Sequence, residues 1–171
     1  MSEFAHRLTL DRIRDGERLD LSADEAERTR IADRLGLATL ERLDAHIVLR
    51  REGDRIDASG RFKAMLEQRC VASGAALPVR LDEAFALTFL PNPAPGDDEI
   101  ELGADDLDTL FHDGLAIDLG DAIADSLALA LDPYPRSATA DAALREAGVI
   151  SEEEAGPFAA LAALKQKLSG A

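Results

Sequence analysis

The chain has 171 residues, of which 46% are hydrophobic, 31% are charged and only 4% are aromatic, with no tryptophan. This length and composition predict one globular domain with a mainly aliphatic core, and they exclude a disordered chain. The longest apolar run, residues 158–164, is far too short for a membrane span, and the first residues lack the pattern of a secretory signal. We therefore expect a cytoplasmic protein that does not contact membranes.

The formal net charge of -15 arises almost entirely from one stretch of the chain. Residues 1–80 hold 15 acidic and 15 basic side chains, residues 81–135 hold 14 acidic side chains and no Lys or Arg, and residues 136–171 hold 5 acidic and 4 basic ones. Such a tract repels a phosphate backbone and attracts a cationic protein, so no DNA contact is expected. A solvated face that keeps the protein soluble is the commoner explanation of an acidic tract, and this alternative stays open.

The first part of the chain predicts a strand followed by a surface helix. Residues 4–10 alternate between apolar and polar side chains as in a half-buried strand. Ser22 and Glu25 have the spacing of a capping box, and Gly36 is a typical left-handed stop. We therefore expect a peripheral helix over residues 22–36.

Period-two alternation over residues 39–91 predicts at least three antiparallel strands. The clearest stretch is 56–66, where the even positions are apolar or small and the odd positions carry a predominantly basic row. A basic row on a sheet is a candidate contact for RNA phosphates, whereas a solvated face of mixed charge is the alternative. The residues assigned to RNA binding are Arg55, Arg61, Lys63 and Arg69.

Prolines end the strand region, and an acidic segment occupies residues 97–132. Its dense carboxylates lack the order of a calcium-binding loop, so no metal site is assigned. A helix is expected over 118–131, where three aspartates at i, i+3 and i+7 form a stripe apart from the apolar face. With two aspartates at the start of the segment, this stripe is assigned to a basic partner: Asp97, Asp98, Asp118, Asp121 and Asp125.

The remaining residues complete the predicted architecture. Residues 136–155 have the weak periodicity of a linker or a short frayed helix, and 157–168 carry the apolar stripe of a C-terminal helix that docks on its own domain or on a partner. The sequence therefore predicts an α+β fold in a single domain over residues 1–171. A curved, partly barrel-like antiparallel sheet with flanking helices forms its centre.

No arrangement typical of catalysis is visible in the sequence. There is no nucleophile elbow, no Gly-rich phosphate loop and no histidine pair at helical spacing. The single cysteine, Cys70, and three scattered histidines cannot form the usual structural zinc sites. We therefore expect neither enzymatic activity nor a cofactor.

Several features resemble one bacterial family when taken in order. Cys70 ends a basic strand and precedes a Gly-containing loop and a Phe-rich strand; Ile-Asp-Leu at 117–119 opens a helix that is followed by Pro133; and Pro-Phe-Ala stands at 157–159. From about residue 65 to 165 the chain resembles the YceD family, whose members are described as large ribosomal RNA subunit accumulation proteins. The resemblance implies a small, noncatalytic cytoplasmic factor of ribosome biogenesis.

The chain departs from this family at one motif. Many members carry Cys-x-x-Cys where this sequence has Glu67 and Cys70, and relatives with a further Cys or His have it where this sequence reads Arg-Ser-Ala at 136–138. A metal site in those relatives is therefore not expected in this chain.

Together these observations predict a factor whose acidic segment binds a basic partner such as a ribosomal protein, with the basic sheet face as the candidate contact for ribosomal RNA. Two alternatives stay open. One is a metal-assisted nuclease or phosphodiesterase that uses the carboxylates of residues 97–108. The other is an acidic mimic of nucleic acid that blocks a basic site on another protein.

Overall fold

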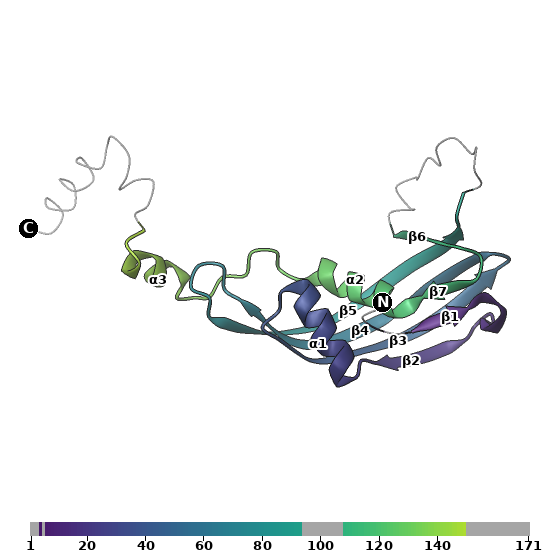
Figure 1. Cartoon of the computed structure of the whole chain (residues 1–171), viewed down its shortest axis with the longest axis horizontal. Coiled ribbons are helices and arrows are strands. Elements are labelled where there is room, and N and C mark those ends of the chain that lie inside the picture. The colour runs from purple at the N-terminus through teal and green to yellow at the C-terminus, as the bar shows by residue number, and fades with distance from the viewer. Residues whose placement is uncertain (1–3, 5, 94–107, 150–171) are drawn as a thin grey trace, which may run out of the picture. The chain divides into compact units, whose positions relative to one another are not determined.

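The computed structural model describes residue 4 and residues 6–93 and 108–149 (Figure 1). The chain divides into two compact units, which are described separately. Of the described residues, those up to 68 together with 78–93 and 108–133 form the larger unit, and 69–77 together with 134–149 form the smaller one. The predicted C-terminal helix over 157–168 lies outside the described residues, as do Asp97 and Asp98.

The fold is α+β, as the sequence predicts. A five-stranded sheet has the order β2-β3-β4-β5-β6, and a separate two-stranded ribbon pairs β1 with β7. The strands are β1 (Arg7–Thr9), β2 (Arg18–Ser22), β3 (Thr39–Glu52), β4 (Arg55–Arg69), β5 (Ala76–Pro91), β6 (Thr109–His112) and β7 (Ala116–Asp118). The helices are α1 (Glu25–Leu35), α2 (Leu119–Ala130), α3 (Ala140–Glu146) and a short 3-10 helix at Leu10–Arg12.

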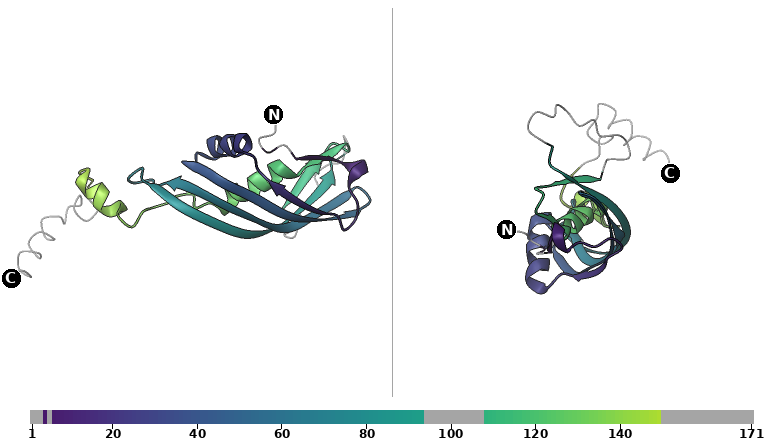
Figure 2. Two further views of the ribbon diagram at one scale, coloured as in Figure 1. Left: turned by 90° about the horizontal axis from the view of Figure 1, so that it is seen from below. Right: turned by 90° about the vertical axis from the view of Figure 1, so that its right-hand side faces the viewer.

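The five-stranded sheet is mixed, because its last strand runs parallel to its neighbour. β2, β3 and β4 pair antiparallel, whereas β6 pairs parallel with β5, from Thr88 opposite Thr109 to Pro91 opposite His112. Figure 2 shows the strands curving around α2. The long strands lie within the predicted range 39–91, but β6 and β7 fall in the acidic segment and were not predicted. Strands of four and three residues are too short to give a periodic signal.

The first helix begins two residues later than its predicted capping box. Asp24 is the N-cap, and its side chain accepts a hydrogen bond from the Glu27 amide while the Glu27 carboxylate accepts one from the Asp24 amide, each at 2.8 Å. The assignment of the box to Ser22 and Glu25 was therefore wrong. Ser22 is the last residue of β2 and donates its hydroxyl to Asp44 at 2.7 Å instead. Gly36 ends the helix in the left-handed region, as predicted.

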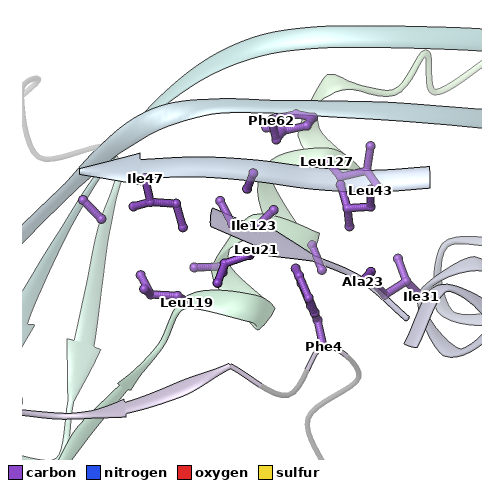
Figure 3. Packing of buried hydrophobic residues seen from close by; sticks show 14 of the residues in the cluster. Phe4, Leu21, Ala23, Ile31, Leu43, Ile47, Phe62, Leu119, Ile123 and Leu127 are labelled. Atoms are coloured by element: carbon purple, nitrogen blue, oxygen red, sulfur yellow. The ribbon is translucent and has the colours of Figure 1, made fainter. Parts of the chain in front are cut away.

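The core of the larger unit lies between the sheet and α2 (Figure 3). The even positions of β4 are buried through most of its length, which confirms the predicted alternation, and Phe62 is 1% exposed. Leu119, Ile123 and Leu127 of α2 are fully buried in the same cluster. α2 is apolar around most of its circumference because the curved sheet covers much of it. The predicted helix over 118–131 is confirmed, with Asp118 and Leu131 as its caps.

The first turn of α2 packs directly on the N-terminal segment. Gly120 permits this approach, since a Cβ at this position would lie 1.9 Å from the carbonyl oxygen of Phe4. The amide of Leu119 also donates to the His6 carbonyl at 3.1 Å. These contacts fix the start of α2, and with it the aspartates that follow.

The smaller unit contains α3, which lies in the region predicted as a linker or a short helix. This helix has seven residues, of which Ala140 is buried. No helix in the described part of the chain combines the length and the hydropathy needed to cross a membrane.

Candidate functional site

A groove of about 440 Å³ lies beside the N-terminal half of α2 in the larger unit, and we call it the acidic groove. Its walls come from α2, β6 and β7, with single residues from β1 and from the end of β5. Four aspartates line it, against one basic side chain, Arg7. The lining aspartates are Asp113, Asp118, Asp121 and Asp125, and the apolar lining residues are Phe89, Leu110, Phe111, Ala116, Ile117 and Ala122. The groove therefore combines an apolar surface with one predominant charge sign.

The structure brings the predicted aspartate stripe of α2 to one side of this groove. Asp118 caps the helix, since its carboxylate accepts a hydrogen bond from the Asp121 amide at 3.1 Å. Asp125 is exposed and forms an ion pair with Arg34 of α1, with 2.8 Å between Nη1 and Oδ1. The carboxylates of Asp118 and Asp125 thus have local partners, and all three aspartates of the stripe line the groove.

Asp113 belongs to the site but was not assigned to it from the sequence. Its carboxylate accepts the amide hydrogens of Leu115 at 2.9 Å and Ala116 at 3.3 Å, and it pairs with Arg7 at 3.4 Å. The two amide donors, helped by Arg7, hold the pKa of Asp113 below its usual range. The Asp-Gly turn at 113–114 is visible in the sequence. Its approach to α2 depends on the β1–β7 pairing, which is not.

His112 lines the acidic groove, and both of its ring nitrogens have hydrogen-bond partners. It is 4% exposed, its Nδ1 accepts a hydrogen bond from the Gly114 amide at 3.1 Å, and its Nε2 lies 2.9 Å from the Asp54 carbonyl oxygen. Because Nδ1 accepts, the hydrogen must be on Nε2. His112 therefore orients the turn that carries Asp113.

A second groove of about 480 Å³ borders the C-terminal half of α2. Ser126, Leu129 and Ala130 line it from the helix, and residues 83–87 line it from β5. Phe62 and Asp108 complete the lining. Leu129 is 83% exposed, whereas Leu127, two residues earlier and on the opposite side of the helix, is fully buried. We call this feature the second groove.

The basic row of β4 lies on the other side of the sheet from α2. Arg55, Arg61, Lys63 and Arg69 are all exposed, as the alternation predicts. Arg61 donates to the carboxylate and to the carbonyl oxygen of Asp82 at 2.9 and 2.8 Å, and Lys63 lies 3.5 Å from the same carboxylate. The hydrogen bond from Arg61 lowers the pKa of Asp82. Arg55 pairs with Asp57 at 3.0 Å.

The neighbouring strands continue this alternation of charge. His46 of β3 stands opposite Arg61 in the register, and its Nδ1 lies 2.6 Å from the Asp20 carboxylate on β2. Asp44 stands opposite Lys63. The geometry thus favours a solvated face of mixed charge over a uniform basic surface, and RNA binding by this face stays a prediction.

No metal-binding cluster is found where the chain is described. Within residues 4, 6–93 and 108–149, no three His, Cys, Asp or Glu side chains are grouped so that they could hold an ion. Of the carboxylates of residues 97–108, on which the nuclease alternative depends, all but Asp108 lie outside the described residues.

Cys70 has polar partners within the smaller unit. Its sulfur accepts a hydrogen bond from the Ser137 amide at 3.3 Å and lies 3.6 Å from the Ser137 hydroxyl oxygen. Hydrogen bonding by the Ser73 side chain, followed by that of the Ser137 amide, lowers the pKa of the thiol to about 6. The cysteine is free and buried.

The structure is an α+β fold with two grooves along α2. Comparison with protein families matches residues 58–165 to the family described as large ribosomal RNA subunit accumulation protein YceD. The match covers more than half of the chain, so the chain belongs to the YceD family, which confirms the resemblance drawn from its motifs. No curated protein and no solved structure matches the chain.

Proposed function

We propose that the chain is a noncatalytic cytoplasmic factor that supports accumulation of large-subunit ribosomal RNA by binding a basic ribosomal protein in the acidic groove. Membership of the YceD family supports the ribosomal context. The observation that carries the choice of partner is the groove lining, in which four aspartates and one arginine surround apolar side chains. Ribosomal proteins that bind RNA must be rich in Lys and Arg, which is the complementary chemistry.

The acidic groove favours a protein over RNA for two reasons. Its carboxylates repel phosphates, because RNA binding depends on cationic side chains that displace counterions. Its apolar lining, which includes Phe111 at 43% exposure, offers contact area that an aliphatic or aromatic side chain of a protein partner can bury. Direct RNA contact through the outer face of β4 is not part of the proposal, since Arg55, Arg61 and Lys63 there pair with carboxylates.

The test removes charge from the groove while keeping its shape. In Asp118→Asn/Asp121→Asn/Asp125→Asn, asparagine preserves the helix cap because Asn caps as well as Asp. Binding of purified large-subunit ribosomal proteins is measured by fluorescence anisotropy at low and physiological salt. We expect the affinity for the cognate basic protein to fall about tenfold at low salt, with a weaker salt dependence.

The matched control makes the same change in net charge elsewhere on the larger unit. Asp33→Asn/Glu41→Gln/Glu52→Gln alters three exposed carboxylates that do not line the groove. It should leave binding within twofold of the unaltered chain. Equal losses in both variants would reduce the effect to net charge, and no loss in either would refute the proposal. In cells that lack the gene, only the control variant should restore the level of large-subunit ribosomal RNA.

The mimic of nucleic acid differs from this proposal in one outcome. A mimic occupies the RNA-binding site of its partner, so added ribosomal RNA should displace the chain from the basic protein. A factor that delivers the protein while that site stays accessible should form a ternary complex with the RNA. Native mass spectrometry of the three-component mixture distinguishes the two.

A further inference from the structure

We infer that the segment held by the acidic groove is an amphipathic cationic helix, whose basic residues lie in the acidic groove and whose apolar residues continue into the second groove. This inference rests on the proposed function, because it describes the part of the basic partner that is recognised. It assigns a role to the second groove and to Leu129, which the acidic groove alone does not use.

The two grooves adjoin along two elements of the larger unit. On α2, the acidic groove is lined up to Asp125 and the second groove begins at Ser126. On β5, residues 83–87 line the second groove and Phe89 lines the acidic groove. The two grooves therefore follow one another along both α2 and β5, so that one segment lying along α2 contacts both.

Each of the two grooves is lined by a large exposed apolar side chain. Phe111, at 43% exposure, lines the acidic groove, and Leu129, at 83%, lines the second groove. A partner segment that contacts both grooves would therefore bury apolar surface in each of them.

The side of α2 that lines the second groove carries small side chains next to Leu129. Ser126 and Ala130, at i and i+4, are partly exposed, whereas Ala122 one turn earlier is 3% exposed and belongs to the core. The Ser126 hydroxyl donates to the Ala122 carbonyl at 2.9 Å, so this side of α2 presents a satisfied hydroxyl to its partner. α2 has 12 residues and is about 18 Å long, which a partner helix of about three turns spans.

Charge decides between a foreign helix and a second copy of this chain. The lining of the second groove contains Glu83 and Asp108 and no Lys or Arg, and the acidic groove contains four aspartates and one arginine. A second copy would bring the same carboxylates to the interface, where like charges oppose association. A cationic segment neutralises them.

The experiment uses the full chain and a labelled three-turn model peptide with lysines toward one end and leucines along one helical face. A scrambled peptide of identical composition has no apolar face. The test variant is Leu129→Ser, and the control is Val71→Ser, at a residue that is 57% exposed in the smaller unit. We expect Leu129→Ser to weaken the amphipathic peptide about fivefold and the scrambled peptide by less than twofold. Val71→Ser should change neither.

The outcomes separate this inference from the proposed function. If Leu129→Ser has no effect while removal of the three groove aspartates weakens both peptides, the basic partner stays in the acidic groove and the continuation into the second groove is refuted. If the unaltered chain binds both peptides equally, recognition is by charge alone and the inference fails. If removal of the three groove aspartates weakens the binding of neither peptide, the proposed function is refuted as well. A chain dimer that Leu129→Ser abolishes, seen by sedimentation, would assign the second groove to a second copy and overturn the inference.

Discussion

The outer face of β4 and the face of α2 both carry many charged side chains, but the two faces arrange them differently. On β4, Arg61 and Lys63 share Asp82 and Arg55 pairs with Asp57, so opposite signs alternate across the sheet. Along α2 one sign predominates and apolar side chains lie beside the carboxylates. Surface ion pairs contribute little to stability, but they neutralise a face. Asp113 and Asp125 of the acidic groove also have basic partners, Arg7 and Arg34. The two faces therefore differ in the excess of one sign, because four aspartates and only one arginine line the groove.

The largest expected effect is on the free energy of unfolding, and it distinguishes the buried side of α2 from its exposed side. Leu127 is fully buried and Leu129 is 83% exposed, although only one residue lies between them. Leu127→Ala should lower the free energy of unfolding by about 3 kcal/mol, because it leaves a cavity in the core. Leu129→Ala should change it by less than about 0.5 kcal/mol. Urea unfolding followed by circular dichroism measures both, and equal losses would show that Leu129 is packed in solution.

The next largest effect concerns the close approach of β3 and β4, the strands that carry many of the paired charges. A Cβ on Gly60 would lie 1.9 Å from the His46 carbonyl oxygen, and Gly60 stands opposite Ile47 in the β3–β4 register. Gly60→Ala should therefore cost about 2 kcal/mol of stability, since backbone must move apart. Ser59→Ala, at the exposed neighbouring position, is the control and should have little effect. A neutral Gly60→Ala would mean that β3 and β4 lie further apart than the structure shows.

A smaller effect is expected on partner affinity when the one positive charge in the lining of the acidic groove is removed. Arg7 is the basic side chain in the acidic groove and pairs with Asp113, with both side chains about half exposed. Arg7→Gln should raise the affinity for a basic peptide about threefold at low salt, because it removes a repulsive charge and releases a carboxylate. Arg50→Gln, on the outer face of β3, is the matched control. Weaker binding by Arg7→Gln would mean that Arg7 itself contacts the partner.

The sequence predicted the parts of this molecule that have a strong local period. Alternation located β4 and its exposed basic row, and the apolar spacing with Asp118 as cap located α2. Side-chain pairs and cap positions that depend on tertiary contacts could not be predicted from the sequence. The pairing of Arg61 and Lys63 with Asp82 requires the β4–β5 neighbourhood, and the capping box shifted to Asp24 because Ser22 is held in β2 by Asp44.

The candidate site was predicted only in part for the same reason. The stripe Asp118, Asp121 and Asp125 follows from helical spacing alone and does face one groove. Asp113 joins it through the short strands β6 and β7, which have no periodic signature. Leu129 lies off the apolar face that Leu119, Ile123 and Leu127 form, so helical spacing alone sets it apart from the core. That it lines a groove together with residues 83–87 of β5 depends on tertiary packing.

The smallest expected effect concerns the pH dependence of the paired face. Hydrogen bonding by Arg61 holds the folded-state pKa of Asp82 below its ordinary value of 3.8. The pair therefore stabilises the fold above about pH 4 and loses this contribution as the pH falls through the lowered pKa. The stability difference between the unaltered chain and Asp82→Asn should be constant near neutral pH and shrink below about pH 4. In an Arg61→Gln/Lys63→Gln background the difference should be smaller at every pH, because the partners of the carboxylate are gone. If this stability difference depends on pH to the same extent in that background, a group other than Arg61 and Lys63 lowers the pKa of Asp82. The outer face could then no longer be described as neutralised by its own pairs.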